Sequence, residues 1–145
     1  LADPARLPRQ TIGEVSRLAV LNTYRQRKGE SGAAVSVGED DFGGQGPESR
    51  FPFVPVSLYL GAAAIARRFG IEHVFVLTEP RLARHFVRIG FDIRPVGGVI
   101  EHRGSRVPSL MSSSKVVAGL RPMIRPMYDV IDASVAAAFP ATEYV

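Results

Sequence analysis

The chain has 145 residues, of which 46% are hydrophobic and 22% charged, and it contains no cysteine. This composition suits one globular domain with a single core and excludes collagen-like repeats, wholesale disorder, disulfides, a thiol nucleophile and cysteine-ligated metal. No apolar run approaches the roughly 20 residues of a membrane span, and no basic-then-apolar leader precedes the chain, so we expect a cytoplasmic protein without a transmembrane segment.

The cations are almost all arginine. Lys and Arg total 18 against 14 Asp and Glu, which gives a formal net charge of +4. A planar guanidinium binds carboxylates and phosphates, so an acidic partner is one interpretation, and an arginine-rich codon bias is the other. Because the arginines are spread out, without a basic stripe or interleaved aromatic residues, we expect no nucleic-acid binding.

The N-terminal third predicts one strand and one loop. Apolar residues across Thr11–Leu21 indicate a buried strand, and their alternation slips near Ser16 and Arg17 as it does at a β-bulge. Residues 28–50 are rich in glycine, serine and acidic groups, which predicts a long flexible loop.

The middle of the chain alternates helix and strand. Apolar residues at helical spacing predict a helix over 55–69 that ends before Gly70. A short apolar run predicts a strand over 73–77, and a second amphipathic pattern predicts a helix over 79–89 that stops at Gly90.

The C-terminal third predicts a hairpin and a helical segment. Strands over 91–100 and 107–111 are joined by a turn at 101–106. Residues 112–139 are helical in pattern and interrupted by two prolines, so we expect a short helix, a break and a last helix over 125–139. The alternation predicts an α/β layered domain with at least one parallel crossover.

Polar residues inside the first predicted strand are the first candidate site. Glu14, Ser16 and Arg17 would be costly in a buried strand unless they satisfy one another or meet a ligand. One interpretation is an ion pair at a sheet edge. The other is a polar cleft in which Glu14 receives a proton, directly or through water, and Arg17 holds that carboxylate or an anionic ligand.

Residues 14–20, Glu-Val-Ser-Arg-Leu-Ala-Val, resemble the E-x-S-R strand of acyl-homoserine-lactone (autoinducer) synthases and related N-acyl amino acid synthases, within the GNAT acyltransferase superfamily. The resemblance continues in order through four further segments: Arg-Arg-Phe-Gly-Ile at 67–71, Glu-Pro-Arg-Leu at 79–82, Ile-Gly-Phe at 89–91 and His-Arg-Gly-Ser-Arg-Val-Pro at 102–108. The whole succession, over residues 12–125, is most similar to acyltransferases associated with PEP-CTERM/exosortase systems.

The resemblance implies an α/β fold of the GNAT-like (acyl-CoA N-acyltransferase) type, a mixed sheet flanked by helices. It also implies that residues 1–145 form the C-terminal part of a single such domain, without the strands and helices at its N-terminal side. In this family a gap opens between a central strand and its neighbour, and the acyl thioester lies in that gap.

The function that the resemblance implies is an N-acyltransferase, which transfers a fatty acyl group from a carrier thioester to the amine of an amino acid or related metabolite. Because the acceptor amine is the nucleophile, no protein cysteine is needed. One wall of the gap would supply the catalytic residues, with backbone N–H groups around Leu18 to Val20 facing the thioester oxygen. The implied catalytic residues are Glu14, Ser16, Arg17, Leu18 and Val20, and the implied donor-binding wall is Val74, Phe75 and Val76.

The donor is expected to be an acyl carrier protein rather than coenzyme A, although no cofactor is expected to be tightly bound. Coenzyme A-dependent relatives follow this strand with a glycine-rich loop for the pyrophosphate, whereas residues 24–30 keep only the basic start and one glycine. Carrier proteins are usually acidic, which suits the arginine excess. We place Arg25, Arg27 and Lys28 near the phosphopantetheine phosphate or the carrier, with an ordinary solvated basic surface as the alternative.

The acceptor's carboxylate, if it is an amino acid, would bind Arg103 and Arg106, unless these form only a charged turn. No metal site is expected, because His73 and His102 are isolated. An apolar set of five residues forms either an acyl pocket or plain core: Phe51, Phe53, Val56, Leu60 and Phe75.

One position departs from the family. Many GNAT enzymes protonate the leaving thiolate with a tyrosine where this chain has Phe86, so either the neighbouring His85 serves or the thiolate leaves unaided. Phe86 also favours the alternative function, a non-catalytic GNAT-like module that binds acyl chains or an acyl carrier protein.

Overall fold

The computed structural model describes residues 3–21, 34–36 and 53–141. After two short 3-10 helices (Pro4–Arg6 and Arg9–Thr11), its elements are β1 (Ile12–Val15), β2 (Ala19–Leu21), β3 (Ala34–Ser36), α1 (Phe53–Arg68), β4 (His73–Thr78), α2 (Pro80–Ile89), β5 (Ile93–Pro95), β6 (Ile100–Glu101), β7 (Ser105–Ser112), α3 (Ser113–Gly119) and α4 (Arg125–Ala138).

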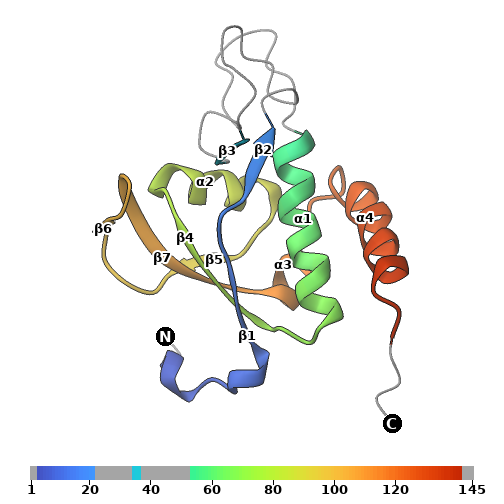
Figure 1. Cartoon of the computed structure of the whole chain (residues 1–145), viewed down its shortest axis with the longest axis horizontal. Coiled ribbons are helices and arrows are strands. Elements are labelled where there is room, and N and C mark those ends of the chain that lie inside the picture. Colours follow the sequence, from blue (N-terminus) through green and yellow to red (C-terminus); the bar gives the residue numbers. More distant parts are fainter. Residues whose placement is uncertain (1–2, 22–33, 37–52, 142–145) are drawn as a thin grey trace, which may run out of the picture.

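A mixed sheet with the strand order β1-β4-β7-β5 forms the centre of the domain, and the short β6 pairs with the start of β7 (Figure 1). β1 and β4 are parallel, from Ile12 opposite His73 to Val15 opposite Val76, whereas β7 is antiparallel to both β4 and β5. Parallel neighbours need a long crossover connection, and α1 lies in the one between β1 and β4. The expected α/β class with a parallel crossover is therefore confirmed.

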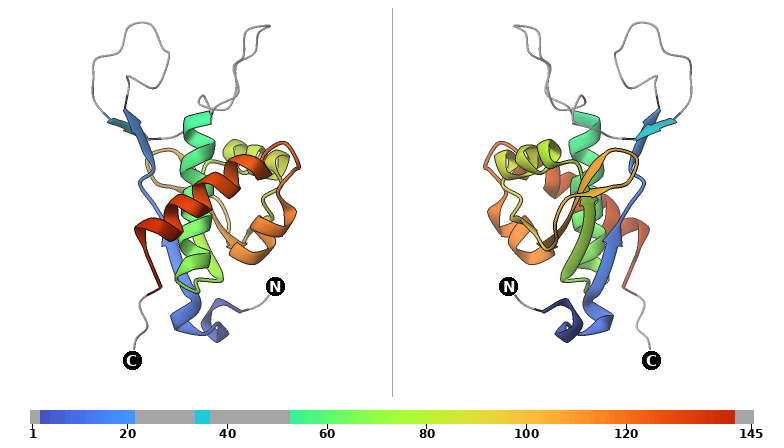
Figure 2. Two further views of the ribbon diagram at one scale, coloured as in Figure 1. Left: turned by 90° about the vertical axis from the view of Figure 1, so that its right-hand side faces the viewer. Right: turned by 90° about the vertical axis from the view of Figure 1, so that its left-hand side faces the viewer.

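One hydrophobic core joins the sheet to all four helices. It lies against the sheet face that carries Val74, Val76 and Met111, and α1 contributes the fully buried Val56 and Leu60. The last helix, α4, crosses α1 and packs on it (Figure 2). Burial of these side chains is the main term that stabilises the fold.

Helix α2 is bounded by the residues that the sequence predicts. Pro80 begins it, because proline suits a first helical turn, and Gly90 caps it in the left-handed conformation with φ of 99°. Gly90 also lies against the end of α3, where a Cβ would come within 2.2 Å of the carbonyl oxygen of Gly119. Glycine is thus required here by both backbone conformation and space.

A carboxylate and three serines join the start of β4 to the start of α3. Glu72 accepts hydrogen bonds from the hydroxyls of Ser112, Ser114 (2.6 Å) and Ser113 (3.3 Å). Burial raises the pKa of Glu72, but these hydrogen bonds outweigh it and hold the pKa below its ordinary value of 4.5. The charged form of Glu72 is therefore the one that stabilises the fold.

The first strand differs from the expectation. In place of one bulged strand over Thr11–Leu21, β1 ends at Val15, residues 16–18 are irregular, and β2 pairs with β3 in a separate two-stranded sheet. Arg17 has a φ of 57°, which is unusual for a residue with a side chain and turns the chain away from β4. The predicted phase slip is present, but it ends the strand rather than bulging it.

The other differences are smaller. The strand expected over 91–100 contains only β5 and β6 as paired segments, and β7 begins at Ser105, so the turn is shorter than 101–106. The segment 112–139 divides into α3 and α4 as expected. Of the loop predicted over 28–50, the structure describes only β3, and the remainder lies outside the described residues.

Candidate functional site

A cleft of about 370 Å³ opens where β1 stops pairing with β4. The last paired residues are Val15 and Val76, after which the chain of β1 turns towards β2 while β4 continues towards α2. Described residues from β1 and the segment after it, α1, β4, the start of α2 and the β6–β7 hairpin line the cleft: Glu14, Val15, Ser16, Arg17, Leu18, Tyr59, Val76, Leu77, Thr78, Glu79, Leu82, His102, Arg103 and Arg106.

The β1 wall is polar and open to solvent. Glu14, Ser16 and Arg17 are exposed, and Leu18 is half-buried. Within the part of the chain that the structure describes, no ion pair joins Glu14 to Arg17, so the first of the two interpretations, an ion pair at a sheet edge, is not seen there. Both charged groups are thus presented to the cleft.

The β4 wall carries a buried hydroxyl that sequence reasoning missed. Thr78 is the last residue of β4 and lines the cleft, yet it is only 3% exposed. Its Oγ1 atom makes no hydrogen bond within the described part of the chain. Such a group loses its hydration without compensation, so it is an expensive feature to keep at a cleft wall.

An ion pair fixes the third wall. The guanidinium Nη1 of Arg106 lies 2.5 Å from Oε1 of Glu79, and its Nη2 donates a hydrogen bond of 3.1 Å to the carbonyl oxygen of Arg103. Glu79 precedes α2, so the pair ties the hairpin to the start of that helix. Of the two arginines predicted to bind the acceptor, Arg106 is already paired, whereas Arg103 presents an exposed side chain at the turn.

Backbone strain is concentrated around this cleft. Among the described residues, Arg17 (φ 57°) and Arg103 (φ 53°) are the two non-glycine residues with positive φ, and both line the cleft. This conformation costs roughly 1–2 kcal/mol for a residue with a Cβ. Strained residues of this kind cluster at ligand sites, because the surrounding fold holds them in place.

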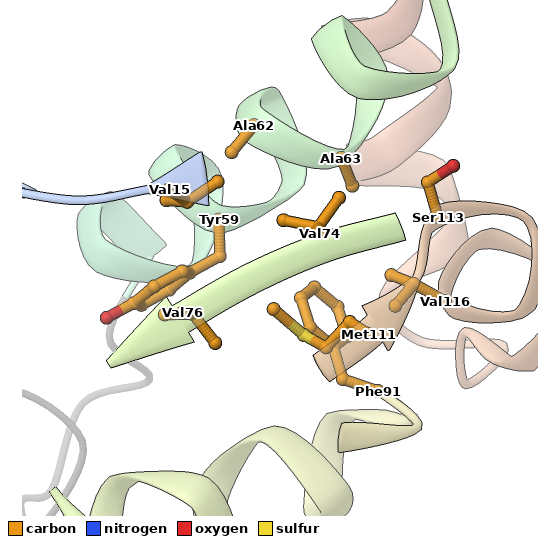
Figure 3. A pocket seen from close by; sticks show the side chains of 10 residues that line it. All are labelled: Val15, Tyr59, Ala62, Ala63, Val74, Val76, Phe91, Met111, Ser113 and Val116. Atoms are coloured by element: carbon orange, nitrogen blue, oxygen red, sulfur yellow. The ribbon is translucent and has the colours of Figure 1, made fainter. Parts of the chain in front are cut away.

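A small apolar pocket of about 30 Å³ lies next to the cleft, among side chains of β1, α1, β4 and β7 (Figure 3). Three residues, Val15, Tyr59 and Val76, line both spaces. The described residues that line the pocket are Val15, Tyr59, Ala62, Ala63, Val74, Val76, Phe91, Met111, Ser113 and Val116.

The structure brings most of the predicted site residues together. Glu14, Ser16, Arg17, Leu18, Val76, Arg103 and Arg106 all line the cleft. It excludes others:

Val20 is buried in β2 and does not line the cleft, and Val74 lines only the small pocket. Phe75 alternates with Val74 and Val76 along β4 and therefore faces the opposite side of the sheet. Arg25, Arg27 and Lys28 lie outside the described residues.

The predicted apolar set is mostly core or surface. Val56 and Leu60 are fully buried, Phe53 is 59% exposed, and none of them lines the cleft or the small pocket. Phe51 lies outside the described residues.

Among the residues of α2, all of which the structure describes, Leu82 alone lines the cleft, and it cannot donate a proton. Phe86 is fully buried, and the centroid of its ring lies 4.4 Å from the centroid of the Tyr59 ring. His85 is half-buried and does not line the cleft, whereas His102 does.

No group of three potential metal ligands (His, Cys, Asp or Glu) is found among the described residues. Likewise, none of the described helices is both long enough and apolar enough to span a membrane.

The chain has distant structural similarity to known proteins. No protein-family model matches the chain, and no curated protein matches it. Among solved structures it is similar to MesI, a CoA-dependent acyl-homoserine lactone synthase, with a TM-score of 0.42 and 16% identity over 69% of this chain and 44% of MesI. It is also similar to TofI in an apo form, with a TM-score of 0.39 and 21% identity over 59% of this chain and 57% of TofI. The chain thus spans about half the length of each.

Proposed function

We propose that the protein is an N-acyltransferase that transfers a fatty acyl group from an acyl carrier protein, or from acyl-CoA, to the amine of an amino acid or related metabolite. The observation that carries the proposal is the position of the cleft, at the point where β1 leaves the parallel strand β4. That is where the resemblance to N-acyl amino acid and autoinducer synthases, including the exosortase-associated ones, puts the thioester.

The reaction needs no nucleophile from the protein. The acceptor amine attacks the thioester carbonyl, so that a C–N bond forms and the C–S bond breaks. The amine loses one proton in this reaction, and the departing thiolate takes up one proton to become the free thiol. We assign Glu14 to accept the proton that the amine loses, directly or through water, because it is an exposed carboxylate on the cleft wall. Backbone N–H groups of the irregular residues 16–18 are the proposed partners of the carbonyl oxygen.

The arginines are proposed to hold the acceptor. Arg17 and Arg103 flank the cleft with exposed side chains, so either can bind a carboxylate through its planar fork. Arg106, besides its predicted role in binding the acceptor, has a structural role in this proposal, because its ion pair with Glu79 holds the hairpin against α2.

The donor is proposed to be an acyl carrier protein because its acidic surface complements the arginine-rich composition and because residues 24–30 lack a glycine-rich phosphate loop. The basic residues expected to meet the donor, Arg25, Arg27 and Lys28, remain a prediction. Parallel assays with the same acyl group on a carrier protein and on coenzyme A decide between the two donors.

A second candidate function is a non-catalytic module that binds acyl chains or an acyl carrier protein. The buried Phe86 favours it, because it cannot protonate a leaving thiolate. Binding of an acylated carrier protein without turnover would select this alternative.

The test combines turnover with matched variants. The purified protein is incubated with acyl carrier thioesters or acyl-CoA and pooled amino acids, and acylated amines are identified by mass spectrometry while free thiol is measured. Glu14→Gln is expected to lower kcat by roughly 100-fold. Arg17→Ala is also expected to lower activity, whereas Arg9→Ala, an exposed arginine away from the cleft, should not. No acylated amine from the unaltered protein, or no loss in either cleft variant, would contradict the proposal.

A further inference from the structure

The small pocket next to the cleft has an almost entirely apolar lining, which suits a hydrocarbon group. Nine of its ten lining side chains, as named above, are those of valine, alanine, methionine or an aromatic residue, and the tenth is Ser113. The Ser113 hydroxyl is already engaged, because it donates to the carbonyl oxygen of Ile71 at 2.7 Å and to Glu72 at 3.3 Å. A water molecule needs two to four polar partners, so this space suits an apolar group better than water.

The cleft and the pocket meet at Val15, Tyr59 and Val76, which line both. Tyr59 is the bulky member of the three, and its ring is held at 90° to the fully buried ring of Phe86. Figure 3 shows the Tyr59 ring lying beside Val76, with its hydroxyl oxygen turned away from Ala63 and Val116. The aromatic ring, not the hydroxyl, is therefore the part of Tyr59 that lies beside Val76, where the two spaces share their lining.

We infer that Tyr59 is a specificity-determining residue, which fixes the length of aliphatic chain that the protein accepts by separating the cleft from the pocket next to it. The inference rests on the proposed function, which supplies an acyl chain in the cleft. The cleft of about 370 Å³ holds the head of the ligand and most of its chain. The pocket of about 30 Å³ has room for only the terminal carbon or two, since a cavity of roughly 150 Å³ is needed for benzene.

Two alanines of α1 set the size of the pocket from the other side. Ala62 and Ala63 line it with single methyl groups (Figure 3). Ala63→Val would add two methyl groups to a space of about 30 Å³ and so shorten the accepted chain. Tyr59→Ala would remove the ring between the spaces and so lengthen it. The two variants are thus predicted to move chain-length preference in opposite directions.

The experiment measures Kd by calorimetry for S-acyl pantetheine thioesters with straight saturated chains of two to twelve carbons. For the unaltered protein, Kd is expected to improve about fourfold per methylene, the equivalent of roughly 0.8 kcal/mol, up to a limiting length, and to improve no further beyond it. Ala63→Val should move the limit to shorter chains and Tyr59→Ala to longer ones. Tyr59→Leu, a gentler change, should move it in the same direction as Tyr59→Ala, and Ala136→Val on the exposed side of α4 should not move it.

The outcomes separate this inference from the proposed function. A limit at the same length in all variants, or a uniform change in Kd at every length, would overturn the role of Tyr59 and leave the acyltransferase proposal standing. If the affinity of the unaltered protein did not depend on chain length, the role of Tyr59 would also be overturned and the acyltransferase proposal would stand. No binding at any length would overturn both.

Discussion

Replacing Thr78 with valine should make the protein more stable. The Thr78 hydroxyl is buried without a hydrogen bond to any described residue, and valine has nearly the same shape without that group. An unsatisfied buried polar group costs roughly 1–3 kcal/mol. Allowing for incomplete relief, we expect Thr78→Val to raise the free energy of unfolding by about 1 kcal/mol.

The measurement is urea denaturation followed by circular dichroism, because the chain has no tryptophan. With a slope of roughly 2 kcal/mol per molar urea, the midpoint should rise by about 0.5 M. Thr78→Ser is the matched control: it keeps the hydroxyl and loses a buried methyl group, so it should be less stable by about 1 kcal/mol. A valine variant less stable than the unaltered protein would refute the reasoning, since it would mean that the hydroxyl has a partner.

The same variant tests whether the hydroxyl is kept for a ligand. If Thr78 hydrogen-bonds a substrate in the cleft, Thr78→Val should gain stability and lose affinity for thioester or acceptor at the same time. A trade-off of this kind is typical of binding sites. Gained stability with unchanged affinity would show that the hydroxyl serves no ligand.

Three further predictions concern the glycine that caps α2, the Glu72 cluster and the Glu79–Arg106 ion pair. Gly90→Ala should lower the free energy of unfolding by about 2–4 kcal/mol, because it combines a positive φ with a backbone clash. Gly70→Ala, with a φ of 68° and open space, should lose only about 1 kcal/mol in the same urea titration. Glu72→Gln should cost roughly 1–2 kcal/mol at pH 7. Because the folded pKa of Glu72 is lowered, that difference should shrink as pH falls below 4.5, and a pH-independent difference would contradict the assignment. Glu79→Gln should free Arg106 and lower the KM for a carboxylate-bearing acceptor by roughly fivefold, or about 1 kcal/mol, while an amine without a carboxylate should show no change.

The sequence predicts helix ends and the polar half of the cleft well, because those signals are local. Pro80 and Gly90 bound α2 as expected, and the polar residues Glu14 and Arg17 mark an interruption in an otherwise apolar strand. The break at Arg17 could be located but not interpreted. Whether a phase slip produces a bulge in a strand or ends the strand depends on the partner strand. Here β2 pairs with β3 and not with β4.

The apolar half of the site could not be predicted in the same way. His73–Leu77 is apolar at nearly every position after the histidine, so no alternation tells the core face from the opposite one. The sequence therefore does not distinguish Phe75 from Val74 and Val76, whereas the structure turns Phe75 to the other face. Tyr59 lies in a helix whose apolar residues surround most of its circumference, and nothing local distinguishes a pocket residue from core.

The exceptions to ordinary local rules all occur in one place. Within the described residues, the two arginines with positive φ and the buried hydroxyl without a partner line the same cleft. Each of them costs on the order of 1–2 kcal/mol, a large fraction of the stability of a small domain. Elsewhere, helix caps, strand register and core packing agree with one another, so the fold tolerates the cost at the cleft. A ligand that hydrogen-bonds Thr78 would relieve one of these costs, and a site that must hold Arg17 and Arg103 in fixed positions would explain the other two.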